Sequence, residues 1–175
     1  GGDQNIQEDS GPHTVNNWAT NIDDGDPELT QILTFNVTND NNSLFSAQPA
    51  ITSAGTLSYI PAVNAYGTAT VTVTLSDDGG GSNQSSPQTF TITINNVNDT
   101  PVVSDIPGET ISEGGSFTTI NLDGFVTDVD NDDSQIIWTV SGNSALTVNI
   151  TNRIATISTP NSDWSGAETI IFKGT

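Results

Sequence analysis

The sequence predicts an all-β chain that folds as two tandem antiparallel β-sandwiches. Three observations predict this class: apolar and polar residues alternate along several short segments, the connections between them are rich in Gly, Asn, Asp, Ser and Pro, and the chain contains an internal repeat. Alternation with a period of two is typical of strands with one buried face, and such connections are typical of turns. No segment has the apolar spacing of an amphipathic helix.

Four segments carry the alternation most clearly, and threonine fills many of their polar positions. Threonine suits the outer face of a strand because its β-branched side chain has little freedom to lose there. The segments are residues 33–37, 70–75, 90–94 and 136–140. Several short strands joined by turns predict antiparallel sandwiches.

An internal repeat organises the chain. Residues 18–23 (WATNID) match 125–130 (FVTDVD), residues 33–37 match 136–140, residues 61–67 (PAVNAYG) match 160–166 (PNSDWSG), and Val71 and Val73 then correspond to Ile170 and Phe172. The spacing between matches drifts slightly, as small loop insertions between fixed strands would produce. We therefore expect two copies of one sandwich.

The boundary between the copies is predicted near Asn96-Val-Asn-Asp-Thr-Pro101, with one domain at residues 1–99 and the next at 100–175. Pro101 stiffens this junction because its ring fixes φ. The second copy ends before the counterpart of the last strand, near Gln88–Asn95, so we expect it to lack that strand. The chain is either a cut piece, which we favour, or receives the strand from another chain by β-augmentation.

The sequence is strongly acidic, with 21 Asp and Glu against 2 Lys and Arg and a formal net charge of -19. Such a charge repels phosphates, so we expect neither nucleic acid nor an anionic membrane as a partner. Close carboxylates also repel one another, and a divalent cation would relieve that repulsion; a merely solvated acidic surface is the alternative. No apolar run is long enough for insertion into a bilayer, and no signal-peptide pattern stands at the start, so we expect an internal piece of a longer protein.

Catalysis has little support in the residue types present. The chain has no cysteine and a single histidine, His13, which excludes disulfides and a Cys/His zinc site and leaves one candidate base for a serine nucleophile. We expect no enzyme.

Longer motifs carry a family resemblance. They are Gly55-Thr-Leu-Ser-Tyr-Ile-Pro61, the run from Asn64-Ala-Tyr-Gly67 to Ser76-Asp-Asp-Gly-Gly80, Val97-Asn-Asp-Thr-Pro101, and Asp163-Trp-Ser-Gly166 with the strand that follows. In this order, and over nearly the whole chain, the sequence resembles the bacterial cadherin-like tandem repeats of giant secreted surface proteins and adhesins. The resemblance implies two Ig-like or cadherin-like Greek-key sandwiches located outside the cell or on the bacterial surface.

The resemblance also implies that Ca2+ binds at the junction between repeats. Asn98 and Asp99 occupy ligand positions of the linker motif, Asp128 and Asp130 match the Asp-x-Asp pair of the following repeat, and Glu8 stands on the first strand, where cadherins place a bridging glutamate. Calcium suits such a set because it takes about six to eight oxygen ligands at flexible angles.

The same resemblance implies two further half-sites. Asn21, Asp23 and Asp77 would serve a preceding repeat, and Glu113 a following one. The sequence departs from the cadherin pattern at Asn64, the nearest counterpart of an Asp-x-Glu motif, and the second copy ends before the counterpart of Asp77. We therefore expect fewer ions than a cadherin junction usually holds.

Simpler roles stand beside these assignments. Asp128 and Asp130 could be turn formers, and Asp77-Asp-Gly79 a plain hairpin turn. Trp18, Trp138 and Trp164 could form a carbohydrate-binding platform, although we expect them to belong to the cores.

The expected function is a calcium-rigidified spacer, a stalk or extender of an extracellular adhesin or surface fibre, with neighbouring repeats of the same protein as its partners. One alternative is an adhesive module that binds surface glycans or matrix proteins directly. Another is a filament subunit that self-associates into fibres by strand complementation.

Overall fold

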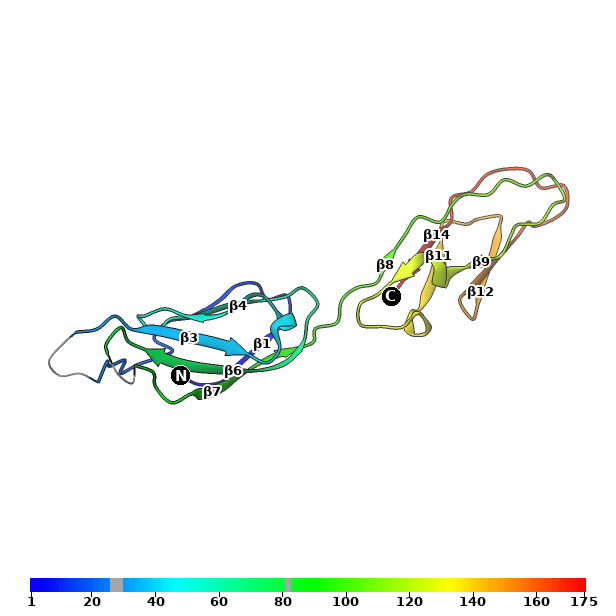
Figure 1. The fold of residues 1–175 in the computed structure, drawn as a ribbon. Coiled ribbons are helices and arrows are strands. Elements are labelled where there is room, and N and C mark those ends of the chain that lie inside the picture. The colour runs from blue at the N-terminus through cyan, green and yellow to red at the C-terminus, as the bar shows by residue number, and fades with distance from the viewer. Residues whose placement is uncertain (26–29, 81–82) are drawn as a thin grey trace. The chain divides into compact units, whose positions relative to one another are not determined.

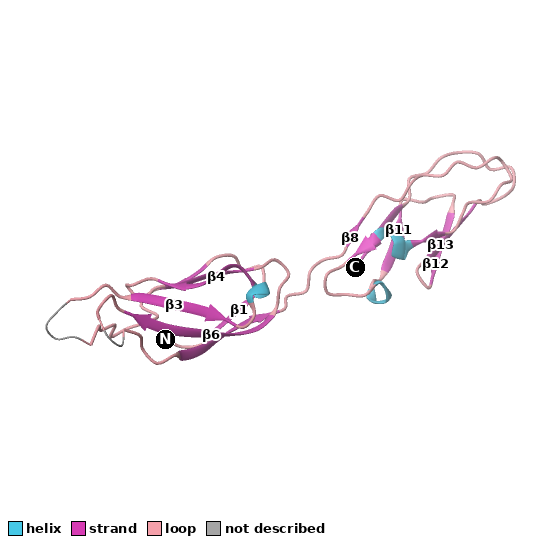
Figure 2. Ribbon diagram, viewed as in Figure 1, coloured by secondary structure: helices cyan, strands magenta, loops and turns pink. Residues whose placement is uncertain are grey.

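The computed structural model describes residues 1–25, 30–80 and 83–175. These ranges hold strands and three short 3-10 helices but no α-helix, which confirms the predicted all-β class (Figures 1 and 2). None of the helices described is long and apolar enough to cross a membrane. The chain divides into two compact units, residues 1–97 (unit 1) and 98–175 (unit 2).

Unit 1 consists of two sheets. One has the spatial order β1-β7-β6-β3 and the other β2-β5-β4. Their bounds are β1 Gln4–Gln7, β2 His13–Val15, β3 Thr34–Asn39, β4 Phe45–Ile51, β5 Leu57–Pro61, β6 Gly67–Ser76 and β7 Gln88–Asn95, with the 3-10 helix η1 at Asn42–Leu44. β7 lies between its two neighbours, parallel to β1 and antiparallel to β6.

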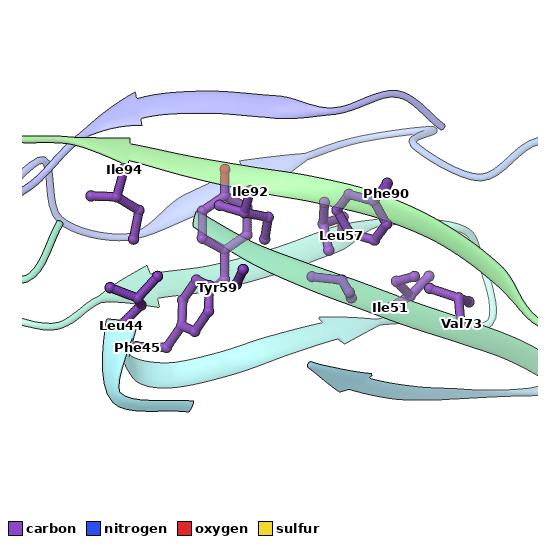
Figure 3. Packing of buried hydrophobic residues seen from close by; sticks show 11 residues of the cluster. Leu44, Phe45, Ile51, Leu57, Tyr59, Val73, Phe90, Ile92 and Ile94 are labelled. Atoms are coloured by element: carbon purple, nitrogen blue, oxygen red, sulfur yellow. The ribbon is translucent and has the colours of Figure 1, made fainter. Parts of the chain in front are cut away.

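The core of unit 1 follows from the alternation seen in the sequence. On β7, Phe90, Ile92 and Ile94 are 6%, 0% and 2% exposed, because every second side chain of a strand points to the same face. They pack against apolar side chains of the other sheet, among them Leu57 and Tyr59 (Figure 3). The full buried cluster is Leu44, Phe45, Ile51, Leu57, Tyr59, Ala69, Val71, Val73, Phe90, Ile92 and Ile94.

Unit 2 has three small sheets, of order β12-β13-β9, β11-β14 and β10-β8. Their bounds are β8 Val102–Val103, β9 Ile120–Asn121, β10 Val126–Thr127, β11 Trp138–Ser141, β12 Thr147–Thr151, β13 Ile154–Ser158 and β14 Ile171–Gly174, with the 3-10 helices η2 at Leu122–Phe125 and η3 at Asp133–Gln135. In the described residues, unit 2 has no counterpart of β7. Its sandwich is therefore open where unit 1 is closed.

Strand pairing in the two units follows the internal repeat. In unit 1, β3 pairs antiparallel with β6 so that Val37 stands opposite Val73. In unit 2, β11 pairs with β14 so that Val140 stands opposite Phe172, which are the two residues that the repeat equates with that pair. The order β2-β5-β4 is likewise matched by β9-β13-β12.

A carboxylate clamp holds the loop between β11 and β12. Glu168 accepts hydrogen bonds from the backbone N–H groups of Ser144, Ala145 and Leu146 at 2.9, 2.6 and 3.2 Å, and from the Ser144 hydroxyl at 2.8 Å. These donors, the Ser144 N–H first, lower the pKa of Glu168 from 4.5 to about 2. The carboxylate therefore fixes the loop while it is ionised.

We expect this clamp to weaken in acid. The folded-state pKa of Glu168 lies below its ordinary value, so its stabilising effect is complete above pH 4.5 and is lost as the pH falls toward 2. Hydrogen exchange of the Ser144–Leu146 amides, corrected for the intrinsic pH effect, should speed up over that window. In the Glu168→Gln variant these amides should exchange faster at pH 7 and lose the acid-dependent step; a variant with the wild-type profile would contradict the clamp.

Candidate metal-binding residues in each unit

Glu8 is the only charged residue that is buried in the described part of the chain, with 3% of its surface exposed. It does not stand on the first strand, as predicted, but directly after it, since β1 ends at Gln7. Its backbone N–H continues the pairing of β1 with β7 by donating to the Asn95 carbonyl at 2.9 Å. The closed sheet of unit 1 is what buries this side chain.

The two carboxylate oxygens of Glu8 have different surroundings. Oε1 accepts a hydrogen bond from the Val97 N–H at 2.8 Å, which ties the end of unit 1 to a residue far away in the sequence. Oε2 is buried, and no described residue gives it a hydrogen bond. A buried carboxylate oxygen without a donor is unfavourable, and a cation at this oxygen would relieve that cost.

In unit 2, the linker and the Asp-x-Asp pair come together. The Asp99 N–H donates to Asp130 Oδ2 at 2.6 Å, so that the start of the unit is held against the turn after β10. This bond also explains why Asn98 and Asp99, at the end of the first predicted domain, group with unit 2. Asn98 is exposed, and its side-chain amide donates to the Asp99 carbonyl at 2.6 Å.

Asp128 has the turn-forming role that was considered for it. Its Oδ1 accepts from the backbone N–H groups of Asp130 and Asn131, each at 2.9 Å, so the side chain does form the turn. Its Oδ2 is buried and has no hydrogen-bond partner in the described residues. The turn therefore uses one carboxylate oxygen of Asp128 and leaves the other buried without a donor among the described residues, as is also found for Glu8 in unit 1.

The residues assigned to a preceding repeat are less closely organised. Asn21 is exposed and has a left-handed backbone with φ of 54°. Asp23 is also exposed, and its Oδ1 accepts from the Gly25 N–H at 2.7 Å. Asp77 Oδ1 accepts from the Gly79 N–H at 2.8 Å, as in an aspartate-initiated turn.

Glu113 differs from its counterpart Glu8. The pattern Ile111-x-Glu113 repeats Ile6-x-Glu8, yet Glu113 is exposed. In unit 1 the Glu8 N–H bonds to the Asn95 carbonyl at the end of β7, and the described part of unit 2 has no counterpart of that strand.

No three Asp, Glu, His or Cys side chains gather tightly enough to form a metal site by themselves in residues 1–25, 30–80 and 83–175. The sequence motifs did not point to the Val97 N–H as the partner of Glu8, nor to Asp9, whose carboxylate accepts from the Asn64 N–H at 3.1 Å. Only its position next to Glu8 in the sequence could have drawn attention to Asp9.

The single histidine forms a hydrogen-bonded pair with a serine. Ser10 Oγ lies 2.7 Å from His13 Nε2, and the Ser10 hydroxyl donates to the Gln7 carbonyl at 2.6 Å. Which of the two groups donates depends on the tautomer of His13. The His13 ring stacks on Tyr59 at 5.3 Å.

Comparison with solved structures finds distant likenesses to cadherins. The chain is similar to extracellular cadherin domains 1–5 of protocadherin gamma B2 at 13% identity and a TM-score of 0.47, covering 92% of this chain and 31% of that one. It is similar to chicken VE-cadherin domains EC1-2 at 12% identity and a TM-score of 0.40, covering 99% and 96%. An endo-fucoidan hydrolase of glycoside hydrolase family 107 follows at 16% identity and a TM-score of 0.31, covering 100% and 26%. The chain thus spans about a third of the protocadherin chain that it matches.

A search of curated proteins found no match. The family model of the bacterial Ig domain, however, matches residues 2–95. Domains of this kind are typically non-enzymatic structural or adhesive modules exposed at the bacterial surface, in agreement with the predicted resemblance. Because the match covers more than half of the 175 residues, the chain belongs to the bacterial Ig domain family.

Proposed function

We propose that this chain is a pair of calcium-rigidified spacer repeats from the stalk of a bacterial extracellular adhesin or surface fibre. The observation that carries the proposal is a pair of buried carboxylate oxygens, Glu8 Oε2 in unit 1 and Asp128 Oδ2 in unit 2, to which no residue in the described part of the chain donates a hydrogen bond. Both belong to residues that the linker motif assigns to one junction. The chain has 2 Lys and Arg in total, and among the described residues neither forms an ion pair with these oxygens.

The donor set favours calcium over other metals. Glu8, Asn98, Asp99, Asp128 and Asp130 would hold the ion, and they offer carboxylate and amide oxygens. Zinc prefers cysteine and histidine, whereas calcium takes about six to eight oxygens at flexible angles. Calcium would supply the positive charge that this acidic junction lacks.

Rigidity would follow from charge neutralisation. Glu8 is anchored to unit 1 through Asn95 and Val97, while Asp130 is anchored to unit 2 through Asp99. Without an ion the acids repel one another and favour an open linker; with an ion they are drawn together and the linker stiffens. Pro101 would add to this stiffness.

The remaining candidate ligands extend the proposal along a row of repeats. Asn21, Asp23 and Asp77 would complete a site with a preceding repeat, and Glu113 with a following one. Neighbouring repeats are then the immediate partners, and surface glycans or matrix proteins would be bound by another part of the parent protein. Extracellular calcium modules usually bind at roughly 10⁻⁴ to 10⁻³ M, which suits a site outside the cell.

Isothermal titration calorimetry tests the binding step. We expect calcium to bind with a Kd of roughly 10⁻⁴ to 10⁻³ M, and Asp128→Asn to weaken binding about tenfold or more because one ligand charge is lost. Asp163→Asn is the matched control, since Asp163 is an exposed acid whose contact with Ser162 lies outside the junction. If both variants weakened calcium binding equally, the loss would reflect the overall negative charge of the chain and not a ligand role of Asp128.

Small-angle scattering tests the rigidity. Calcium should narrow the distribution of interatomic distances at long range, and a chelator should broaden it again. The Asp163→Asn variant should behave as the parent chain. A distance distribution that does not respond to calcium in either chain would overturn the spacer mechanism.

A further inference from the structure

Two consecutive acids, Glu8 and Asp9, follow the first strand of unit 1, and their carboxylates hold two different segments of the chain. Glu8 Oε1 accepts a hydrogen bond from the Val97 N–H at 2.8 Å, and Asp9 Oδ1 accepts one from the Asn64 N–H at 3.1 Å. Val97 lies just after β7, and Asn64 lies in the turn between β5 and β6. The calcium site proposed above includes Glu8 but not Asp9.

The strand register places these two segments at the same end of unit 1. The pairing of β6 with β7 begins with Gly67 opposite Ile94. Asn64 lies three residues before Gly67, and Val97 lies three residues after Ile94, so both segments leave the sheet where that pairing starts. β1 ends at the same level, beside the last residues of β7. Both carboxylates therefore contact the chain at this one end of the unit.

The backbone of Asp9 explains how two consecutive acids can act at one end. Consecutive side chains of a strand point to opposite faces of a sheet, which would separate Glu8 from Asp9. Asp9 has a left-handed backbone with φ of 55°, so it breaks this alternation directly after β1. Aspartate and asparagine adopt this conformation more readily than most residues other than glycine.

The Glu8 side chain gives an independent reason to place a cation here. It is 3% exposed, and no group in residues 1–25, 30–80 and 83–175 donates a hydrogen bond to its Oε2. A buried carboxylate oxygen without a donor is unfavourable. The adjacent carboxylate of Asp9 adds repulsion to this cost, and a cation bound to both side chains would relieve the two effects together.

We propose that Asp9 is a second carboxylate ligand of the cation bound at Glu8, an inference that rests on the proposed calcium function and adds a ligand to the same site. Calcium fits this pair because it accepts several carboxylate oxygens at flexible angles. Through its bond to Asn64, Asp9 would also connect the ion to the turn between β5 and β6. Glu8 makes the corresponding connection to the residues after β7 through Val97.

An NMR titration of the complete chain with calcium tests this role, because each carboxylate has its own reporter amide. The Val97 amide reports on Glu8, and the Asn64 amide reports on Asp9. Both amide resonances should shift along one binding curve with the same Kd. Asp9→Asn should weaken calcium binding about tenfold. Asparagine retains an acceptor for the Asn64 N–H and tolerates the left-handed backbone, so the substitution removes only the charge.

The matched control is the same kind of bond at the other end of β1. Asp3 precedes β1, and its Oδ1 accepts from the Thr91 N–H at 2.8 Å. At about 3.3 Å per strand residue, Asp3 and Glu8 are about 16 Å apart. This separation exceeds the Debye length of about 8 Å at physiological ionic strength. The Thr91 amide should therefore shift little, and Asp3→Asn should change the Kd less than about twofold.

The outcomes distinguish the role of Asp9 from the calcium function itself. A Val97 shift without an Asn64 shift larger than that of Thr91 would remove Asp9 from the site while calcium binding stands. Equal Kd changes in the two variants would do the same, because the effect would then reflect overall charge. No calcium binding by the parent chain would overturn the proposed function together with the role of Asp9. The amide shifts need no substitution, so they decide the question even if a variant folds poorly.

Discussion

Replacing Ile92 by alanine should lower the free energy of unfolding of unit 1 by about 2–5 kcal/mol. Ile92 is 0% exposed and stands at the centre of β7, the strand that joins β1 to β6. The substitution removes buried methyl and methylene groups and leaves a cavity, since neighbours on two packed sheets relax only in part. The cost should appear as faster global exchange of the amides in β6 and β7.

Two controls make this prediction specific. Ile92→Val should cost about 0.5–1.5 kcal/mol, because only one methylene is lost. Ile32→Ala should stay within about 0.5 kcal/mol, since Ile32 is 71% exposed. Exchange in β12 and β13 of unit 2 should not change in any of the three variants. An equal loss in both units would show that they unfold as one body.

Calcium should raise the free energy of unfolding by about 2.7 kcal/mol at one hundred times its Kd, because the ion binds the folded junction and not the unfolded chain. Glu8→Gln should abolish most of this gain. Glutamine preserves the size of the side chain and an acceptor for the Val97 N–H, but removes the charge that the ion would neutralise. Urea unfolding with calcium and with chelator measures the difference.

The matched control for Glu8→Gln is Asp105→Asn, which removes one negative charge from an exposed position. This variant should keep the calcium response of the parent chain. Magnesium at the same concentration distinguishes specific binding from general screening of the acidic charges. It should raise the free energy of unfolding less than calcium does if the site is specific, since magnesium demands near-octahedral geometry and gives up its waters reluctantly. Equal responses of Glu8→Gln and the parent chain would remove Glu8 from the site.

Several site residues could be found from the sequence because their roles are local. The turn at Asp128 uses the N–H groups of the next few residues, a bonding pattern that aspartate forms wherever the chain turns. Its other oxygen could not be foreseen, because burial of Asp128 Oδ2 depends on packing of the whole unit. The carboxylate clamp of Glu168 escaped notice for the same reason, since its donors are more than twenty residues away.

The contrast between Glu8 and Glu113 illustrates what a local sequence pattern cannot predict. Both follow the pattern Ile-x-Glu and stand at equivalent places in the repeat, so the sequence treats them alike. Glu8 is buried and Glu113 is exposed. Glu8 directly follows β1, which pairs with β7, whereas residues 109–112 before Glu113 belong to no strand.

By itself, the sequence determined the all-β class, the alternating strands and the equivalence of Val37 with Val140 and of Val73 with Phe172 in the repeat, because a period of two decides which face of a strand is buried. Only the tertiary structure decided which carboxylate oxygens are buried without a donor among the described residues. These properties arise where segments distant in the sequence meet, as Glu8 meets Val97, and no local pattern encodes such meetings.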